Sequence, residues 1–257
     1  MCIRDRLGLD WLARCQSVDG RWDVDGFVRV AANSGSPGYH VQSDVALTGL
    51  AILCFLGQNH TPSTPSSPHR TTVMRALRWL ERQQSPNGLL AGEDEKYAMY
   101  CHGIATLALS EAYTLPHNQR HREPLERALQ LIVQSQNRRT GGWRYRPEPP
   151  IRGDTSISGW QVMALTSLRN GGFSVSDMVF DRCRHWLDKE VASGRHGGIY
   201  GYSSPEEARP AMVAEGMIAR QLLGGRRQDR NVEESARYLH TETRGGAHLN
   251  NLYLVYY

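Results

Sequence analysis

A repeat of about 55 residues constrains the fold of this chain more than any other feature of the sequence. A bulky residue followed by leucine or isoleucine recurs at Trp11-Leu12, Trp79-Leu80, Leu131-Ile132, Trp186-Leu187 and Tyr238-Leu239. A turn with glycine follows each pair, at Asp19-Gly20, Asn87-Gly88, Gly141-Gly142, Gly197-Gly198 and Gly245-Gly246. The spacing between the first and second pairs is longer than the other spacings. Residues 61–70, which are rich in Pro, Ser and Thr, account for the extra length, and we predict a surface loop there.

A second set of glycines recurs between these turns, at Gly49, Gly103, Gly159 and Gly216, each inside an apolar run of helical length. Each unit is therefore predicted to hold two helices, an amphipathic outer one and an inner one that is apolar on all sides. An inner helix of this kind has to be buried all round, so we expect two concentric layers closed into a ring rather than an open superhelix. Glycine costs about 1 kcal/mol relative to alanine inside a helix, and its recurrence predicts that inner helices approach closely at these positions.

The starts of the inner helices are expected to carry recognisable residues. Asp44 and Asp154 are predicted to be N-caps, and Pro210 suits a first helical turn.

Composition excludes several classes of function. The net charge is +4, but 28 of the 30 basic residues are arginines scattered through the chain, so we expect no nucleic-acid partner. No apolar run reaches the length of a membrane span. The five cysteines include no CxxC pair and are predicted to stay reduced, with Cys54 and Cys101 acting as small buried hydrophobes.

The two ends of the chain depart from the repeat. Residues 1–6 fit no later pattern and are predicted to be a non-native leader, while the chain stops inside an apolar aromatic run. The expectation is a single truncated domain over residues 7–257. No signal peptide is visible, because residues 1–6 lack an apolar segment, and the localisation is left open.

The turns carry a motif that is more specific than their glycines. The first pair is followed by Gln16, Gly20 and Trp22, the second by Gln84 and Gly88, and the third by Gln136, Gly141 and Trp143. This string resembles the Gln-Trp repeat of squalene and hopene cyclases. The chain therefore resembles the prenyltransferase and squalene-cyclase repeat superfamily, and residues 99–103 and 153–161 are similar to uncharacterised bacterial members of planctomycete type. The resemblance implies an all-α fold, an (α/α)6-type toroid with about four and a half hairpins present.

The acid that cyclases of this kind use is missing from the sequence. Hopene-type cyclases protonate an alkene with an Asp-x-Asp-Asp motif at an inner-helix start, because a lone Asp is too weak an acid. The best match is Arg152-Gly153-Asp154, in which Gly153 replaces the proton donor. Asp23 and Asp25 supply two carboxylates, but they lie in the loop after the first turn rather than at such a start. We therefore expect no standard protonating cyclase.

Metal and sugar chemistry were weighed in the same way. Asp181, Cys183 and His185 project along one outer helix, and Cys101-His102 lacks a carboxylate partner, so we predict neither a metal nor a cofactor. Glycosidases on related barrels use two carboxylates that flank a sugar. Asp44, Asp154 and Glu215 all fall near inner-helix starts, which leaves such a pair open.

The candidate cavity residues share a place near the start or the glycine of an inner helix: Asp44, His102, Asp154, Trp160, Gln161 and Glu215. For each of these residues the alternative to a functional role is a purely structural one, as a helix cap or a hydrogen-bonded core residue. The leading hypothesis is a toroid that binds an apolar or isoprenoid ligand in its centre or a protein at its rim. The alternatives are an active cyclase or prenyl transferase with a non-standard acid or base, and a structural repeat module. Whether the chain is an enzyme is left open.

Overall fold

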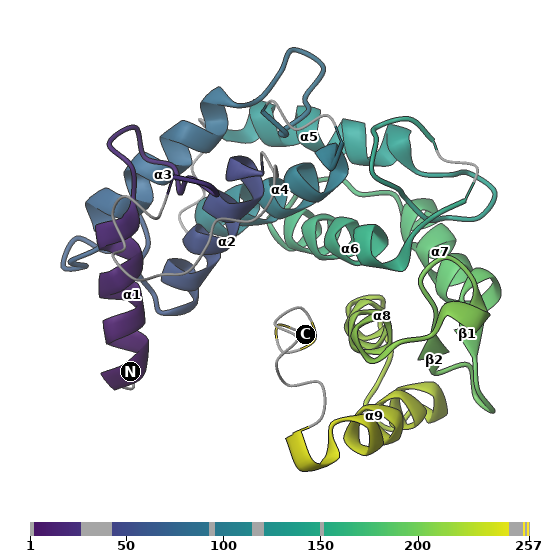
Figure 1. Cartoon of the computed structure of the whole chain (residues 1–257). Coiled ribbons are helices and arrows are strands. Elements are labelled where there is room, and N and C mark those ends of the chain that lie inside the picture. Colours follow the sequence, from purple (N-terminus) through teal and green to yellow (C-terminus); the bar gives the residue numbers. More distant parts are fainter. Residues whose placement is uncertain are drawn as a thin grey trace. The chain divides into compact units, whose positions relative to one another are not determined.

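The computed structural model describes residues 3–26, 43–92, 96–114, 121–149 and 152–246, together with residues 254 and 256. Nearly all the regular secondary structure of these residues is helical, as predicted (Figure 1). The helices are α1 (Ile3–Cys15), α2 (Asp44–Gly57), α3 (Arg70–Arg82), α4 (Ala98–Thr114), α5 (Arg122–Ser135), α6 (Thr155–Asn170), α7 (Asp177–His185), α8 (Pro210–Leu222) and α9 (Arg230–Glu242). A π-helical turn (Trp186–Glu190) follows α7, and 3-10 turns span Pro205–Glu207 and Arg244–Gly246.

The predicted alternation of outer and inner helices is confirmed. The bulky pairs lie in α1, α3, α5 and α9 or directly after α7, and the repeated glycines lie in α2, α4, α6 and α8. Between the fourth outer and inner helices, strands β1 (Ala192–Ser193) and β2 (Ile199–Tyr200) form an antiparallel pair with Ala192 opposite Tyr200. The small sheet is an elaboration of the fourth repeat turn.

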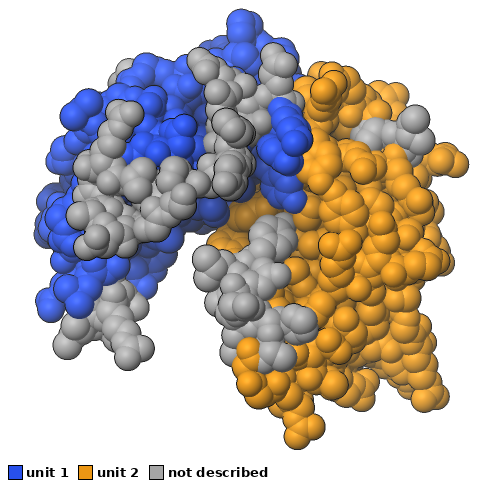
Figure 2. All heavy atoms as spheres, viewed as in Figure 1, with its two compact units in different colours: residues 1–131, 167–173 blue, residues 132–166, 174–257 orange. Residues whose placement is uncertain are grey.

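The chain divides into two compact units, which Figure 2 colours separately. Unit 1 comprises residues 1–131 and 167–173, and unit 2 comprises residues 132–166 and 174–257. In unit 1, α2 and α4 lie side by side with α3 against them (Figure 1). In unit 2, α8 packs on α9, and β2 lies against both helices.

The burial of the inner helices follows the prediction in α4 but not in α2. Residues 101–110 of α4 are all buried. One face of α2 remains open, because Leu47 and Leu50 are half-buried and Cys54 is exposed. The expectation that α2 is enclosed on every side, and that Cys54 is a core residue, was therefore wrong. An apolar composition shows only that a surface avoids water, and the neighbours that cover it depend on the packing of the whole unit.

The repeated glycines occur at close contacts, although the neighbour is not always a helix. A Cβ at Gly49 would lie 2.8 Å from Ile104 Cγ2 in α4, and one at Gly159 would overlap the side chain of Glu215 in α8. At Gly216 the obstacle is the ring of Tyr200 in β2. Close approach is thus confirmed at these three positions, but the prediction of an inner-helix neighbour was wrong for Gly216.

The predicted helix starts have different outcomes. Asp154 precedes α6 and accepts a hydrogen bond from Ser156 N at 2.8 Å, so the N-cap is confirmed. Pro210 lies in the first turn of α8. Asp44 is not a cap, since Ser43 holds that position and Asp44 is the first residue of α2. The predicted loop ends at His69, and α3 begins at Arg70. Helix α1 is continuous from Ile3 across the boundary predicted at residue 7.

Candidate functional site

The glutamines of the repeat motif join each turn to the next outer helix. Gln16 Nε2 donates to Gly20 O and to Thr72 O in α3, both at 2.9 Å. Gln84 does the same with Gly88 O and Pro124 O. In the third turn, Gln136 Nε2 donates to Gly141 O at 2.9 Å and to Val179 O in α7 at 3.1 Å. These contacts give the three glutamines a structural role.

The tryptophans and glycines of the motif act in the same contact. Trp22 Nε1 donates to Leu12 O, and Trp143 Nε1 donates to Ile132 O, so each ring ties the turn back to its own outer helix. The turn glycines lie so close to the following helix that an added Cβ would overlap a backbone carbonyl group. The pairs are Gly20 with Arg75, Gly88 with Arg127, Gly141 with Arg182 and Gly198 with Asn231.

The fourth turn replaces the missing glutamine with a carboxylate from the other side of the contact. Val191 stands where the motif has Gln, and it is fully buried. Glu234 in α9 accepts hydrogen bonds from the backbone amides of Arg195, His196 and Gly198, at 2.8 to 2.9 Å. Burial alone would raise the pKa of Glu234, but these amides lower it below its ordinary value. In the first three turns a glutamine of the turn donates to carbonyl groups of the next outer helix. In the fourth turn the outer helix supplies the acceptor, and the backbone amides of the turn donate to it.

The residue before each repeated glycine also has a shared task. Thr48 Oγ1 accepts from Trp22 N, His102 Nδ1 from Leu90 N, and Ser158 Oγ from Trp143 N, at 3.0 to 3.1 Å. These side chains hold the last residue of a repeat turn against an inner helix. Glu215 occupies the same register before Gly216. The sequence placed His102 and Glu215 in one register but did not reveal this common hydrogen bond.

His102 is enclosed on both sides of its ring. Because Nδ1 accepts the Leu90 amide, Nε2 carries the proton and faces Ala128 O at 3.2 Å. Complete burial lowers the pKa of His102 to about 4, although the Ala128 contact acts to raise it. Both nitrogens are occupied by backbone groups, so the geometry of His102 is that of a structural residue.

Three further candidates are buried in unit 2. Trp160 is 3% exposed, and its ring lies 5.2 Å from that of Tyr256, centroid to centroid. Gln161 is fully buried, and Glu215 is 1% exposed beside Gly159. A cavity of about 10 Å³ beside Trp143 and Gly159 is too small for an organic ligand.

Asp154 belongs to a polar cluster that joins the third and fourth turns. Its Oδ1 accepts from Ser156 N and Oγ, and Tyr202 and Tyr145 interact with the same carboxyl group. The two tyrosine hydroxyls also hydrogen-bond to each other. Burial raises the pKa of Asp154, while the bonds from Ser156 and Tyr202 act to lower it. The two tyrosines therefore brace neighbouring repeats.

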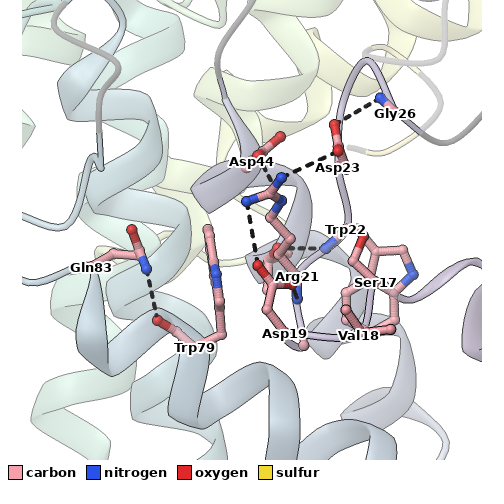
Figure 3. A network of polar contacts seen from close by, with 12 residues as sticks. Ser17, Val18, Asp19, Arg21, Trp22, Asp23, Gly26, Asp44, Trp79 and Gln83 are labelled. Atoms are coloured by element: carbon pink, nitrogen blue, oxygen red, sulfur yellow. Dashed lines mark hydrogen bonds and ion pairs between the residues drawn. The ribbon is translucent and has the colours of Figure 1, made fainter.

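Asp44 lies in a second polar cluster, in unit 1, that the sequence did not assemble. Figure 3 shows the Arg21 guanidinium between the carboxylates of Asp44 and Asp23. Arg21 Nε lies 3.2 Å from Asp44 Oδ2, and Arg21 Nη2 lies 3.3 Å from Asp23 Oδ2. Val24 N donates to Asp44 Oδ1 at 2.8 Å, which brings the loop after the first turn to the start of α2.

This cluster lines a polar cavity of about 250 Å³. Its lining residues come from the first turn, the start of α2, the end of α3 and the second turn: Arg21, Asp23, Val24, Asp25, Asp44, Val45, Trp79, Gln83, Ala91 and Gly92. We call it the Arg21–Asp44 cavity. Asp23 and Asp25 lie in the loop after the first turn, as expected, and this loop brings them to the cavity beside the start of α2. A loop's sequence position does not show where its side chains end up.

The two carboxyl groups next to Arg21 have opposite pKa shifts. Burial raises the pKa of Asp44, although the Val24 amide and Arg21 act to lower it. Burial also acts to raise the pKa of Asp23, but hydrogen bonds with Asp25, Gly26 and Arg21 lower it below its ordinary value. The carboxyl group of Asp44 therefore holds its proton more tightly than that of Asp23.

Over the described ranges, no group of three His, Cys, Asp or Glu side chains could hold a metal ion. Cys183 is fully buried, and burial raises the pKa of its thiol to about 12, opposite to what a zinc ligand needs. None of the described helices is long and apolar enough to cross a membrane.

Comparisons with known proteins support the fold. No family model and no curated protein matches the chain. Among solved structures, it is similar to an inactive variant of the alpha-1,6-mannanase GH76A of Salegentibacter sp. HEL1_6 in complex with alpha-1,6-mannotriose. That match has a TM-score of 0.63 and 12% identity, and covers 91% of this chain and 68% of the mannanase.

Two other solved structures are informative. A variant of the type II terpene cyclase MstE from Scytonema, in complex with geranylgeranyl dihydroxybenzoate, has a TM-score of 0.51 and 14% identity, and the match covers 94% of this chain and 78% of MstE. A protein from Actinoplanes has a TM-score of 0.51 and 18% identity, covering 94% and 80%. The all-α, α/α-toroid fold class is thereby confirmed, and at these identities the likeness shows the fold alone.

Proposed function

We propose that this chain binds an amphipathic ligand of isoprenoid type, with its apolar chain on the open face of α2 and its polar end in the Arg21–Asp44 cavity. One observation carries the proposal: the half-exposed apolar stripe of α2 begins at the polar cavity. Asp44, Leu47, Leu50 and Cys54 recur at helical spacing on one face of the helix.

The apolar stripe offers binding energy to a hydrocarbon chain. Burying apolar surface contributes roughly 25 cal/mol per Å², so covering the half-buried side chains of Leu47 and Leu50 would favour binding before ordering costs. The terpene cyclase MstE was solved in complex with geranylgeranyl dihydroxybenzoate, which also joins an apolar isoprenoid chain to a polar end. That neighbour supports the ligand class.

The charge of the cavity determines which polar end fits. Arg21 is already paired with Asp19, Asp23 and Asp44, at 3.2 to 3.3 Å. With Asp25 also in the lining, carboxylates outnumber the single guanidinium. A hydroxylated end can donate hydrogen bonds to these oxygens, whereas a diphosphate would be repelled.

The test is to add geranylgeraniol, geranylgeranyl diphosphate, squalene or mannotriose to the chain. Binding is measured by titration calorimetry and by the change in melting temperature. We expect geranylgeraniol to bind most tightly and to raise the melting temperature. The Leu50→Glu variant should weaken this binding at least about tenfold, while the matched Leu222→Glu variant in α8, where Leu222 is 38% exposed, should not. Equal binding by both variants, or no binding at all, would contradict the proposal and favour a structural module.

A second candidate is acid–base hydrolysis of a glycoside in the same cavity, favoured by the divergent pKa values of Asp44 and Asp23. Asp44 would protonate the leaving oxygen and Asp23 would act as the carboxylate partner. The complex of GH76A with mannotriose supports a sugar as ligand. Release of reducing sugar from α-1,6-mannan, abolished in both Asp44→Asn and Asp23→Asn, would establish it. A rate unaffected by either change would exclude it.

A further inference from the structure

The loop between α2 and α3, residues 58–69, contains three consecutive turns. Thr64 N donates to Thr61 O, Ser67 N to Thr64 O, and Arg70 N to Ser67 O, at 3.1 to 3.2 Å. In each turn the first residue is followed by proline, whose fixed φ suits the second position of a β-turn. The loop therefore has a defined closed form, and opening it would break a specific set of hydrogen bonds.

Two histidines hold the ends of this loop together. The Nδ1 atom of His60 lies 2.9 Å from Ser67 Oγ, and the same oxygen accepts a hydrogen bond from His69 N at 3.2 Å. The rings of His60 and His69 meet edge to face, with their centroids 4.8 Å apart. The His69 ring also lies 5.1 Å from that of Phe55, a fully buried residue of α2. The closed loop is thus anchored on the end of α2.

The two rings differ in what faces their other nitrogen. His69 Nε2 lies 3.3 Å from Asp10 Oδ1 in α1. His60 Nε2 is buried, and among the described residues it has no hydrogen-bond partner. A proton added to His69 has a carboxylate beside it, whereas a proton added to His60 leaves a charge on an enclosed nitrogen. The closed loop therefore resists protonation of His60.

The electrostatic surroundings of His60 are set by two neighbouring helices. In the described part of the chain, the titratable groups that act on His60 are His69, directly before α3, and Asp10 in α1. Arg70, the first residue of α3, donates through Nε to Pro62 O at 2.8 Å. Burial and His69 lower the pKa of His60, while Asp10 acts to raise it. In an open loop the ring is in water, where the pKa of histidine is about 6.5, so a fall in pH favours the open loop.

We propose that residues 58–69 form a pH-sensitive switch, in which the neutral His60 ring keeps the loop closed and its protonation in mild acid opens the loop. On opening, the charged ring moves into water, the bond between His60 and Ser67 is lost, and the contact between His69 and Phe55 is uncovered. The ratio of open to closed loop should rise by up to about tenfold per pH unit below about pH 6.5. None of the residues that line the Arg21–Asp44 cavity belongs to this loop, so the inference is independent of the ligand proposed above.

The experiment follows amide hydrogen exchange of the 257-residue chain by NMR from about pH 7.5 to about pH 5, with each rate divided by the intrinsic rate at that pH. The Ser67 and Arg70 amides report on the loop, because each of them closes one of its turns. The Gly88 amide, which donates to Ser85 O at 2.9 Å in the second repeat turn, is the internal reference in the same unit. We expect protection of the loop amides to fall more steeply with pH than protection of Gly88.

Two variants and a control assign the effect to His60. His60→Gln can keep a hydrogen bond to Ser67 but cannot take up a proton, so its loop amides should lose no more protection than Gly88 does. Ser67→Ala removes the partner of Nδ1 and should lower protection of the loop at least about twofold already at neutral pH. The matched control His240→Gln, at an exposed histidine in α9, should behave as the wild type does.

Three exchange results would overturn the proposal. They are loop amides that keep their protection below about pH 6.5, loop amides that lose protection in parallel with Gly88, and a His60→Gln loop as sensitive to pH as the wild type.

NMR titration of the histidine ring protons in the wild type covers the case in which His60→Gln does not fold. The His60 ring should titrate with a pKa below its ordinary value, because burial disfavours its charged form. A His60 ring that titrates at or above that value would also overturn the proposal.

Discussion

Replacing Gln136 by methionine tests the structural role assigned to the repeat motif. The side chain is fully buried, and its Nε2 donates to Gly141 O at 2.9 Å and to Val179 O at 3.1 Å. Over the described residues its Oε1 has no hydrogen-bond partner, so only the amide NH₂ group is involved. Methionine keeps the length and volume of the side chain and removes that donor.

The size of the effect follows from the two bonds and their burial. A hydrogen bond contributes about 0.5–1.5 kcal/mol net, and a buried acceptor left without a partner costs about 1–3 kcal/mol. Because Val179 O also accepts from Cys183 Sγ at 3.1 Å, Gly141 O is the group that loses most. We expect Gln136→Met to lower the free energy of unfolding by about 2–3 kcal/mol.

The control is the same change at Gln16. Gln16 makes the same two bonds, both at 2.9 Å, but it is only half-buried. Water can replace its donor there, so Gln16→Met should cost about 1 kcal/mol. Urea unfolding followed by circular dichroism measures both variants. If Gln136→Met costs no more than Gln16→Met, the reasoning from burial is refuted.

Three further predictions concern other buried groups. His102 should lower the free energy of unfolding by about 3 kcal/mol as the pH drops from 7 to 4. The reason is that the His102 ring is protonated near pH 6.5 in the unfolded chain and only near pH 4 in the folded chain. Unfolding at several pH values should show this fall in the wild type and not in His102→Gln. Gly159→Ala should cost about 1–3 kcal/mol by overlap with Glu215, and clearly less in a Glu215→Ala background; an equal cost in both backgrounds would refute the contact. Tyr202→Phe should cost about 1 kcal/mol and raise the pKa of Asp154 further, since the Tyr202 hydroxyl acts to lower it; proton titration by NMR would detect the change, and an unmoved pKa would count against the cluster.

The candidate site illustrates which parts of a structure are visible in a sequence. Asp44 was recognisable because it stands at the start of an apolar helical run, where a carboxylate is a favoured residue. Arg21 was not, because an arginine in a turn has many possible partners along the chain. Its contacts with Asp23 and Asp44 join residues 2 and 23 positions away, and only folding brings the second of them within 3.2 Å.

His102 shows the opposite case, in which a residue suspected of chemistry has a structural task. Its place before a repeated glycine was evident, but the groups facing its ring are backbone atoms of Leu90 and Ala128. Backbone groups of distant segments leave no signal in side-chain patterns. The same is true of Thr48 and Ser158, which make the equivalent bond and attracted no attention in the sequence.

By itself the sequence determined the type of the helices, their alternation and the positions of the turns between repeats. These follow from local periodicity and from a motif whose glutamine, glycine and tryptophan each have a short-range reason to recur. Only the tertiary structure decided which apolar faces stay open, as on α2, and which polar groups meet, as Arg21 meets Asp44. The physical reason is that exposure and charge pairing depend on what lies opposite a surface, and that neighbour comes from elsewhere in the chain.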